Sequence, residues 1–155
     1  MSDVIDYFAA RKDLAARDVD ILGRTLWGEA RGEGQAGMEA VAAVVINRVA
    51  HARSRSNGNF WWGNSITRVC QKPFQFSCWN RGDPNLSKMM ALDDSDRHFA
   101  MALRIARWAV SGNLPDPTGG ADHYHAVYIT PKWAMGRLPT AVIGRHVFYK
   151  LEGDK

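Results

Sequence analysis

Two of the four glutamates in this 155-residue chain, Glu29 and Glu33, stand four residues apart among glycines. Upstream, Val19, Leu22 and Leu26 repeat at spacings of three and four. At about 100° per residue, Glu29 falls in the same arc of a helix as this apolar repeat. Burial of an unpaired carboxylate costs on the order of several kcal/mol, so the group either finds a partner or keeps its proton because its pKa rises. General-acid catalysis requires such a group at the wall of a cleft, so Glu29 is a candidate, although a surface glutamate near a helix end is the commoner case.

Three helices are predicted to position these glutamates. Residues 1–17 are expected to hold an N-terminal helix, and a second helix is expected to begin at 16–18 and run into Glu29. Gly32, Gly34 and Gly37 are expected to end that helix, and the break decides where Glu33 points. The next helix, at about 38–50, has one broad apolar face and is predicted to be the buried centre of the domain.

The rest of the chain predicts a mainly helical α+β fold in one domain, with residues 18–150 as its core. A short helix is expected at 65–71, a loop at 80–92, and a longer helix at 93–111. Beyond a turn-rich hinge, two segments rich in β-branched and aromatic residues predict a small hairpin near the C-terminus; they are 121–129 and 141–150.

An aromatic loop follows the short helix and is the first candidate for substrate binding. Pro73 excludes a helix through this point. An amide and a hydroxyl interleaved with aromatic rings are the usual mixture for holding a carbohydrate. The candidates are Gln75, Phe76, Ser77 and Trp79.

Composition narrows the class of partner. The net charge of +4 and the pI of about 9.3 favour anionic partners, but the basic residues are scattered, which argues against nucleic acid. No apolar run is long enough to cross a bilayer, so no stable membrane insertion is expected. The N-terminus does not resemble a signal peptide, which predicts synthesis in the cytoplasm. Cys70 and Cys78 are eight residues apart, match no redox motif, and are predicted to be free thiols rather than a disulfide.

A metal site is the main alternative source of chemistry. His123 and His125 alternate on a predicted strand and face the same way, with Asp122 and His146 as possible further ligands. Zinc bound there would indicate an amidase that cuts stem peptides. Histidines that flank a tyrosine are more often hydrogen-bonded wall residues. A third hypothesis is a non-catalytic wall-binding or virion module whose aromatic loops form the working surface.

The order and spacing of several motifs resemble the SleB/CwlJ-type cell wall hydrolases, a family that includes spore-cortex-lytic enzymes and phage or prophage proteins. The resemblance covers about residues 20–150. After Gly-Gly-Ala, spore members tend to continue with Tyr-Tyr-Asn, whereas this chain has Asp122-His123-Tyr124-His125 and looks like the Gram-negative and phage branch. The motifs are Trp27–Glu33, Val41–Val49, Gln75–Ser77, Gly119–Ala121 and Ile143–Tyr149.

The resemblance implies a reduced lysozyme-like domain that cleaves peptidoglycan glycan strands between N-acetylmuramic acid and N-acetylglucosamine. It implies a lytic transglycosylase with Glu29 as acid and base and with no cofactor or metal. Hydrolysis by a muramidase-type glycosidase is the alternative that the sequence leaves open. Tyr124 and His125 are expected to line the cleft opposite Glu29. A monomeric, endolysin-like enzyme released to the periplasm through a holin pore is expected. Supporting roles are expected for Glu33, His123 and His146.

Overall fold

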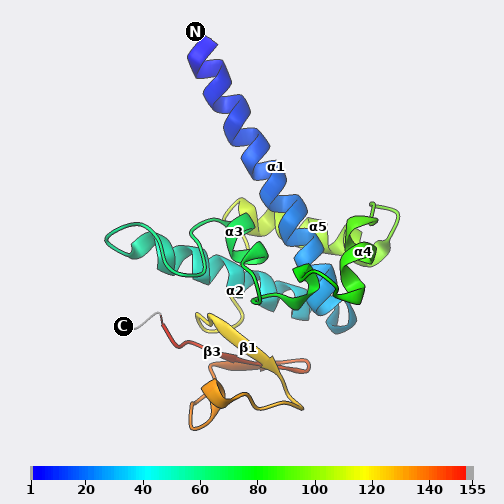
Figure 1. The fold of residues 1–155 in the computed structure, drawn as a ribbon, viewed down its shortest axis with the longest axis vertical. Coiled ribbons are helices and arrows are strands. Elements are labelled where there is room, and N and C mark those ends of the chain that lie inside the picture. Colours follow the sequence, from blue (N-terminus) through cyan, green and yellow to red (C-terminus); the bar gives the residue numbers. More distant parts are fainter. Residues whose placement is uncertain (1, 153–155) are drawn as a thin grey trace.

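A single helix, α1 (Ser2–Ala30), carries Glu29 in its last turn, and its N-terminal half projects from the rest of the molecule (Figure 1). The computed structural model describes residues 2–152, apart from the side chains of Ser2 and Phe8. The predicted division into two helices near 16–18 is wrong, because α1 is continuous over 29 residues. Residues 9–16 contain four alanines and no glycine or proline, so the local propensity favours an unbroken helix.

The predicted break after Glu29 is confirmed. The chain forms a 3₁₀ turn, η1 (Arg31–Glu33), and reverses into α2 (Gly34–Ser54). Gly34 has a φ of +72°, in the left-handed region that favours glycine, and this residue lets the two helices meet at a corner. α2 extends four residues beyond the predicted range at each end, and its inner positions are fully buried.

Shorter helices complete the helical layer. The loop predicted at 80–92 contains the helix α4 (Pro84–Met90). This helix begins in the usual way: the Asp83 side chain accepts a hydrogen bond from the Asn85 backbone N–H, and a proline stands in the first turn. Ser65 caps α3 (Ile66–Gln71) and Asp96 caps α5 (Arg97–Val110), each with a side-chain oxygen that accepts from a backbone N–H. The elements are α3 (Ile66–Gln71), η2 (Ser77–Trp79), α4 (Pro84–Met90) and α5 (Arg97–Val110).

Three short antiparallel strands form a small sheet on the far side of α2 from α3 (Figure 1). The structure has one strand more than the predicted hairpin. The second predicted segment is divided at Gly144, where φ is +57°, and forms two strands, so the sheet has the order β1-β3-β2. The mainly helical α+β class is confirmed. The strands are β1 (His123–Ala126), β2 (Ala141–Ile143) and β3 (His146–Tyr149), with η3 (Lys132–Ala134) between the first two.

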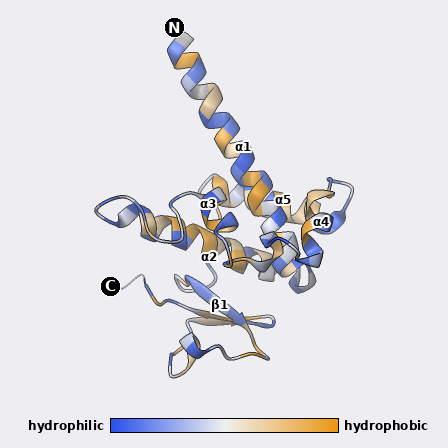
Figure 2. Ribbon diagram, viewed as in Figure 1, coloured by the Kyte–Doolittle hydropathy of each residue, from blue (hydrophilic) through white to orange (hydrophobic). Residues whose placement is uncertain are grey.

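Among the described residues, two apolar clusters hold these layers together. The larger one lies among α1, α2 and α5, where apolar segments face each other (Figure 2). The smaller one joins the sheet to α2 through Ala40, Val44, Ala121 and Phe148. None of the helices among the described residues combines the length and the apolar character that crossing a bilayer needs.

Candidate active site

The carboxyl group of Glu29 is half-buried between the end of α1 and the first strand of the sheet. The Tyr124 hydroxyl donates a 3.4 Å hydrogen bond to Glu29 Oε2. Burial raises the pKa of Glu29, while the amide and thiol of Cys78 and the Tyr124 hydroxyl lower it by less. The sequence-based expectation of an inward carboxylate with a raised pKa therefore holds, and such a group can hold a proton for general-acid chemistry.

Gly28 lets a loop lie directly against this carboxylate. A Cβ at position 28 would stand 2.7 Å from Cys78 Cβ and 2.8 Å from Met89 Sδ, so only glycine permits the close approach. The loop brings Cys78 beside Glu29, and burial raises the pKa of the Cys78 thiol. Cys70 and Cys78 are both buried and free, which confirms the prediction of two unpaired thiols.

Glu33 binds the sheet rather than the glycine turn. Its Oε2 accepts a 3.0 Å hydrogen bond from the Arg145 backbone N–H, and its Oε1 accepts a 2.9 Å bond from Arg145 Nε. These bonds lower the pKa of Glu33, and a side chain at Gly144 would collide with the carboxylate. Glu33 stands at the N-cap position of α2, but its side chain makes no capping bond there. Glu33 therefore ties the α1–α2 corner to the β2–β3 turn.

A cleft of about 340 Å³ opens in front of Glu29. Ala126 and His146 line it from the paired ends of β1 and β3, and the exposed ring of Tyr128 stands at its rim. The His146 ring lies 4.9 Å from that of Tyr124, and burial lowers the pKa of His146. Within residues 2–152, Nδ1 of His146 is buried without a hydrogen-bond partner. This nitrogen is therefore an unsatisfied polar atom beneath the wall of the cleft.

His123 and His125 lie on the face of the sheet opposite His146. His125 donates through Nδ1 to the Ala126 carbonyl at 2.7 Å, and its Nε2 accepts from the Tyr149 hydroxyl at 2.9 Å. His123 Nδ1 lies 2.8 Å from Asp122 Oδ1. Because adjacent strand residues alternate between faces, Tyr124 reaches Glu29 and His125 cannot line the same cleft, which corrects that prediction.

This separation also argues against the alternative of a zinc site at His123, His125 and His146. His123 and His125 are already engaged on one face, while His146 lies on the other. Among the described residues, no group of three His, Cys, Asp or Glu side chains is placed to hold a metal ion. The alternative of a zinc amidase therefore loses its ligand set.

The aromatic loop is mostly an anchor and does not form an open platform for sugars. Phe76 is 3% exposed within the helical core, and the indole of Trp79 donates a 2.8 Å hydrogen bond to Thr25 Oγ1. Gln75 Oε1 accepts from Arg48 at 3.4 Å. Ser77 is exposed at the start of η2. None of these four side chains lines the Glu29 cleft, and the loop instead carries Cys78 to Glu29.

Asn47 and Arg48 set the position of Tyr124 from inside α2. Asn47 Nδ2 donates to the Ala121 carbonyl at 2.9 Å, and Arg48 Nε donates to the Asp122 carbonyl at 2.8 Å. These are the last residues before β1 begins at His123. The two adjacent polar side chains of a buried helix therefore fix the start of the strand that supplies Tyr124.

Sequence reasoning missed four residues that act at or near the site. A signal existed for one of them, because Gly144 before Arg145 marks a turn that brings the side chain back toward the helices. The contacts of the others depend on segments far apart in the chain. The missed residues are Arg48, Cys78, Tyr128 and Arg145.

Comparison with known proteins gives a consistent family result. The profile of the Cell Wall Hydrolase family matches residues 32–149, a range that begins after Glu29. The spore cortex-lytic enzyme of Bacillus cereus is 30% identical over 138 residues, which cover 86% of this chain and 44% of that protein. That of Bacillus subtilis is 29% identical, over 84% of this chain and 37% of its own length. The chain thus spans less than half the length of these relatives.

Solved structures show the same architecture. The crystal structure of the catalytic domain of the Bacillus cereus SleB protein aligns with a TM-score of 0.63 and 28% identity, covering 86% of this chain and 89% of that one. The catalytic domain of the germination-specific lytic transglycosylase SleB from Bacillus anthracis aligns equally well and is covered to 93%. The fold described above is therefore that of the SleB catalytic domain.

Proposed function

The chain belongs to the Cell Wall Hydrolase family, and from that premise we propose that it is a peptidoglycan lytic transglycosylase in which Glu29 is both acid and base. The cleaved bond in this proposal joins N-acetylmuramic acid to N-acetylglucosamine, and residues 18–150 form the catalytic unit. The relative from Bacillus anthracis is described as a lytic transglycosylase, which supports the reaction class.

The proposal rests on the different environments of the two glutamates in the cleft, Glu29 and Glu33. Burial raises the pKa of Glu29, whereas Arg145 holds both oxygens of Glu33 and lowers its pKa. A hydrolase with two working carboxylates needs a second one that is free to activate water or to attack the sugar. Glu33 is committed to Arg145, so the arrangement favours a reaction that uses one carboxylate.

The reaction can proceed on that single group. Protonated Glu29 gives its proton to the glycosidic oxygen, and the bond from that oxygen to C1 of the muramic acid breaks. The resulting carboxylate accepts the proton of the muramic C6 hydroxyl while that oxygen bonds to C1 and closes a 1,6-anhydro ring. Glu29 is thereby reprotonated for the next cycle. The Tyr124 hydroxyl, which donates to Glu29 Oε2, stabilises the carboxylate between the two transfers.

Mass spectrometry of the products tests this proposal directly. Purified protein is incubated with peptidoglycan sacculi from a Gram-negative bacterium, with and without EDTA. We expect 1,6-anhydro-muropeptides in equal yield under both conditions. Reducing muramic ends would show hydrolysis instead, released stem peptides with EDTA-sensitive activity would show an amidase, and unchanged sacculi would show a binding module. Each of these three results contradicts the proposal.

An endolysin-like role on the periplasmic wall of a phage-infected or lysogenic cell is the proposed biological setting. The net charge of +4 supports it, since a basic enzyme concentrates on an anionic polymer. The Asp122-His123-Tyr124-His125 variant of the family motif adds the resemblance to the phage branch.

Replacement of Tyr124 by phenylalanine is expected to lower kcat roughly 10- to 100-fold, because a donor to the developing carboxylate is lost. The hydroxyl lowers the pKa of Glu29, so its loss raises that pKa further. A general acid must be protonated, so the alkaline limb of the pH–rate profile is expected to move to higher pH. The matched control is Tyr149→Phe, whose hydroxyl binds His125 on the other face of the sheet. An unmoved alkaline limb in Tyr124→Phe would contradict this role.

A further inference from the structure

The N-terminal half of α1 projects from the rest of the molecule (Figure 1). Several of its apolar side chains are exposed. Val4 is 58% exposed, Ile5 is 64% exposed, and Leu14 is 59% exposed. A free helix of about 12–15 residues is only marginally stable in water, and exposed apolar groups on it gain most from a packing partner. We call residues 2–10 of this projection the tip.

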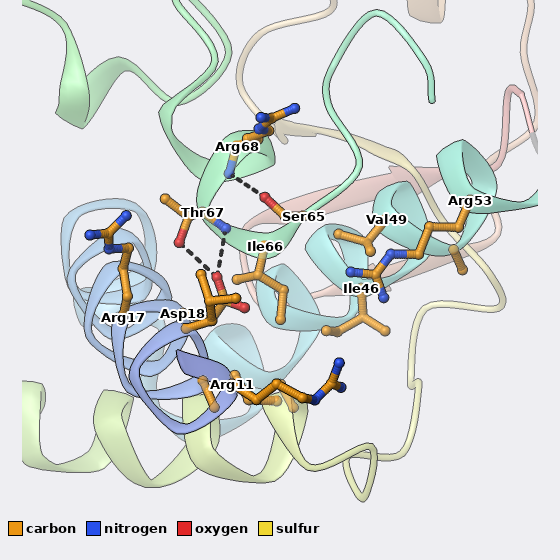
Figure 3. A pocket seen from close by; sticks show the side chains of 15 residues that line it. Arg11, Arg17, Asp18, Ile46, Val49, Arg53, Ser65, Ile66, Thr67 and Arg68 are labelled. Carbon is orange, nitrogen blue, oxygen red and sulfur yellow. Dashed lines mark hydrogen bonds between the residues drawn. The ribbon is translucent and has the colours of Figure 1, made fainter. Parts of the chain in front are cut away.

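An open groove of about 740 Å³ lies where the projection joins the body (Figure 3). Four arginines from three helices surround it, and we call it the arginine groove. Its floor is apolar and comes from α2, α3 and α5. The arginines are Arg11, Arg17, Arg53 and Arg68, and the floor includes Ile46, Val49, Ile66 and Val110.

The arginine groove is basic because the described residues that line it include four arginines and one carboxylate, that of Asp18. Asp18 Oδ1 accepts a 2.7 Å hydrogen bond from the Thr67 hydroxyl and a 3.1 Å bond from the Thr67 backbone N–H, drawn as dashed lines in Figure 3. The tip has the opposite character, since Asp3 and Asp6 are exposed beside Val4 and Ile5. An acidic, apolar helix therefore complements a basic, apolar groove on the same molecule.

The tip and the groove also agree in length. At about 1.5 Å per residue, the nine residues of the tip span roughly 14 Å. The part of α1 that lines the groove, Arg11 to Asp18, spans roughly 12 Å by the same rise. The tip cannot fold back into its own groove, because both belong to one continuous helix. A tip that fills the arginine groove therefore comes from a second copy of the chain.

We propose that two copies of this chain form a two-fold dimer in which the tip of each α1 lies antiparallel to the other α1 and fills its arginine groove. Such a contact is self-complementary and closed, as two-fold interfaces are. It replaces the expectation of a monomer. Glu29 lies 18 residues beyond Arg11 on α1, roughly 27 Å along the helix, so both catalytic clefts stay open.

Charge reversal on either side of the contact tests the dimer. Sedimentation and light scattering across a wide concentration series are expected to give wild-type protein twice the monomer mass of 17.3 kDa. The tip variant Asp3→Arg/Asp6→Arg and the groove variant Arg17→Glu/Arg68→Glu are each expected to weaken self-association about 100-fold or more. All four positions are exposed, and circular dichroism checks that the variants stay folded.

The decisive experiment mixes the tip variant with the groove variant. A reversed tip matches a reversed groove, and the wild-type tip on the second copy matches the wild-type groove on the first. An equimolar mixture is therefore expected to form a heterodimer although neither variant dimerises alone. The control Lys132→Glu/Arg137→Glu, which changes charge at exposed sites after β1, should dimerise like wild type.

Several results would overturn the proposal. They are a wild-type protein that stays monomeric at all concentrations, variants that dimerise normally, or a mixture without rescue. A monomer that floats with vesicles of anionic phospholipid would assign the tip to a membrane surface instead. The readout is mass rather than activity, so it stands whether or not the protein cleaves glycan strands.

Discussion

Replacement of Glu29 by glutamine is expected to lower the rate of glycan cleavage by roughly 10³-fold or more while the fold survives. Glutamine keeps the size of the side chain and can still meet the Tyr124 hydroxyl, but it has no proton to give to the glycosidic oxygen. The assays are release of anhydro-muropeptides from sacculi and lysis of chloroform-permeabilised Gram-negative cells. Both should fall together if the endolysin-like role rests on this chemistry.

The matched control for this variant is Glu39→Gln. Glu39 lies on α2 away from the cleft and accepts a 2.9 Å hydrogen bond from Gln35 at an exposed position. Its replacement should leave the rate within about twofold of wild type, as for most surface substitutions. Near wild-type cleavage by Glu29→Gln would exclude Glu29 as the general acid.

Replacement of Glu29 by glutamine is also expected to raise the stability of the protein at neutral pH. Burial raises the folded-state pKa of Glu29, so the wild-type protein loses stability as pH rises from the unfolded-state value through the folded-state value. The glutamine side chain does not titrate, so the Glu29→Gln variant does not lose this stability over the same pH range. The melting temperatures of the two proteins should therefore agree near pH 4 and separate toward pH 7, with the variant higher. A lower melting temperature for Glu29→Gln at pH 7 would contradict the burial argument.

Replacement of Arg48 by alanine is expected to have the largest effect on stability, a loss of roughly 3–5 kcal/mol in the free energy of unfolding. Arg48 is 6% exposed, and its guanidinium lies over the rings of Trp62 and Phe76, at 5.1 and 5.6 Å from their centroids. Alanine would leave a cavity there and a buried Asp122 carbonyl without its 2.8 Å donor. For a domain of this size the melting temperature should fall on the order of 10 °C.

The comparison variants separate the causes of this loss. Arg48→Lys keeps a charge but not the planar stacking group, so its stability should lie between wild type and alanine. Arg104→Ala, at an exposed position of α5, should change the free energy of unfolding by about 0.5 kcal/mol or less. Arg48→Ala should also lower activity below its melting temperature, because Arg48 holds the start of β1. If Arg48→Ala is as stable as Arg104→Ala, Arg48 does not organise the core.

Local pattern was sufficient for the inward direction of Glu29 and for most of the helices, but not for the continuity of α1 or for α4. The spacing of Val19, Leu22 and Leu26 on one helix determines that Glu29 turns inward, and this periodicity depends only on the helical repeat. Gly34 likewise marks the corner between α1 and α2, because its left-handed conformation excludes most other residues. The mainly helical α+β class follows from the same local signals.

Tertiary structure alone decided what surrounds Glu29. Tyr124 lies 95 residues from Glu29 in the chain, and Arg145 lies 112 residues from Glu33. No local pattern specifies a contact across such separations. Strand register placed Tyr124 on the helical side and His125 on the other, and a shift of one residue would have exchanged them.

The aromatic loop shows the same difference between what the local sequence predicts and what tertiary packing determines. Its residue types indicated carbohydrate binding, but the packing of Phe76 against Arg48 and the bond from Trp79 to Thr25 turned those rings into anchors. The inward direction of Glu29 on its helix is therefore determined by the local sequence. Its raised pKa, its hydrogen-bond donor and its cleft exist only because a sheet from the end of the chain packs against the first helix, where burial removes the carboxylate from water.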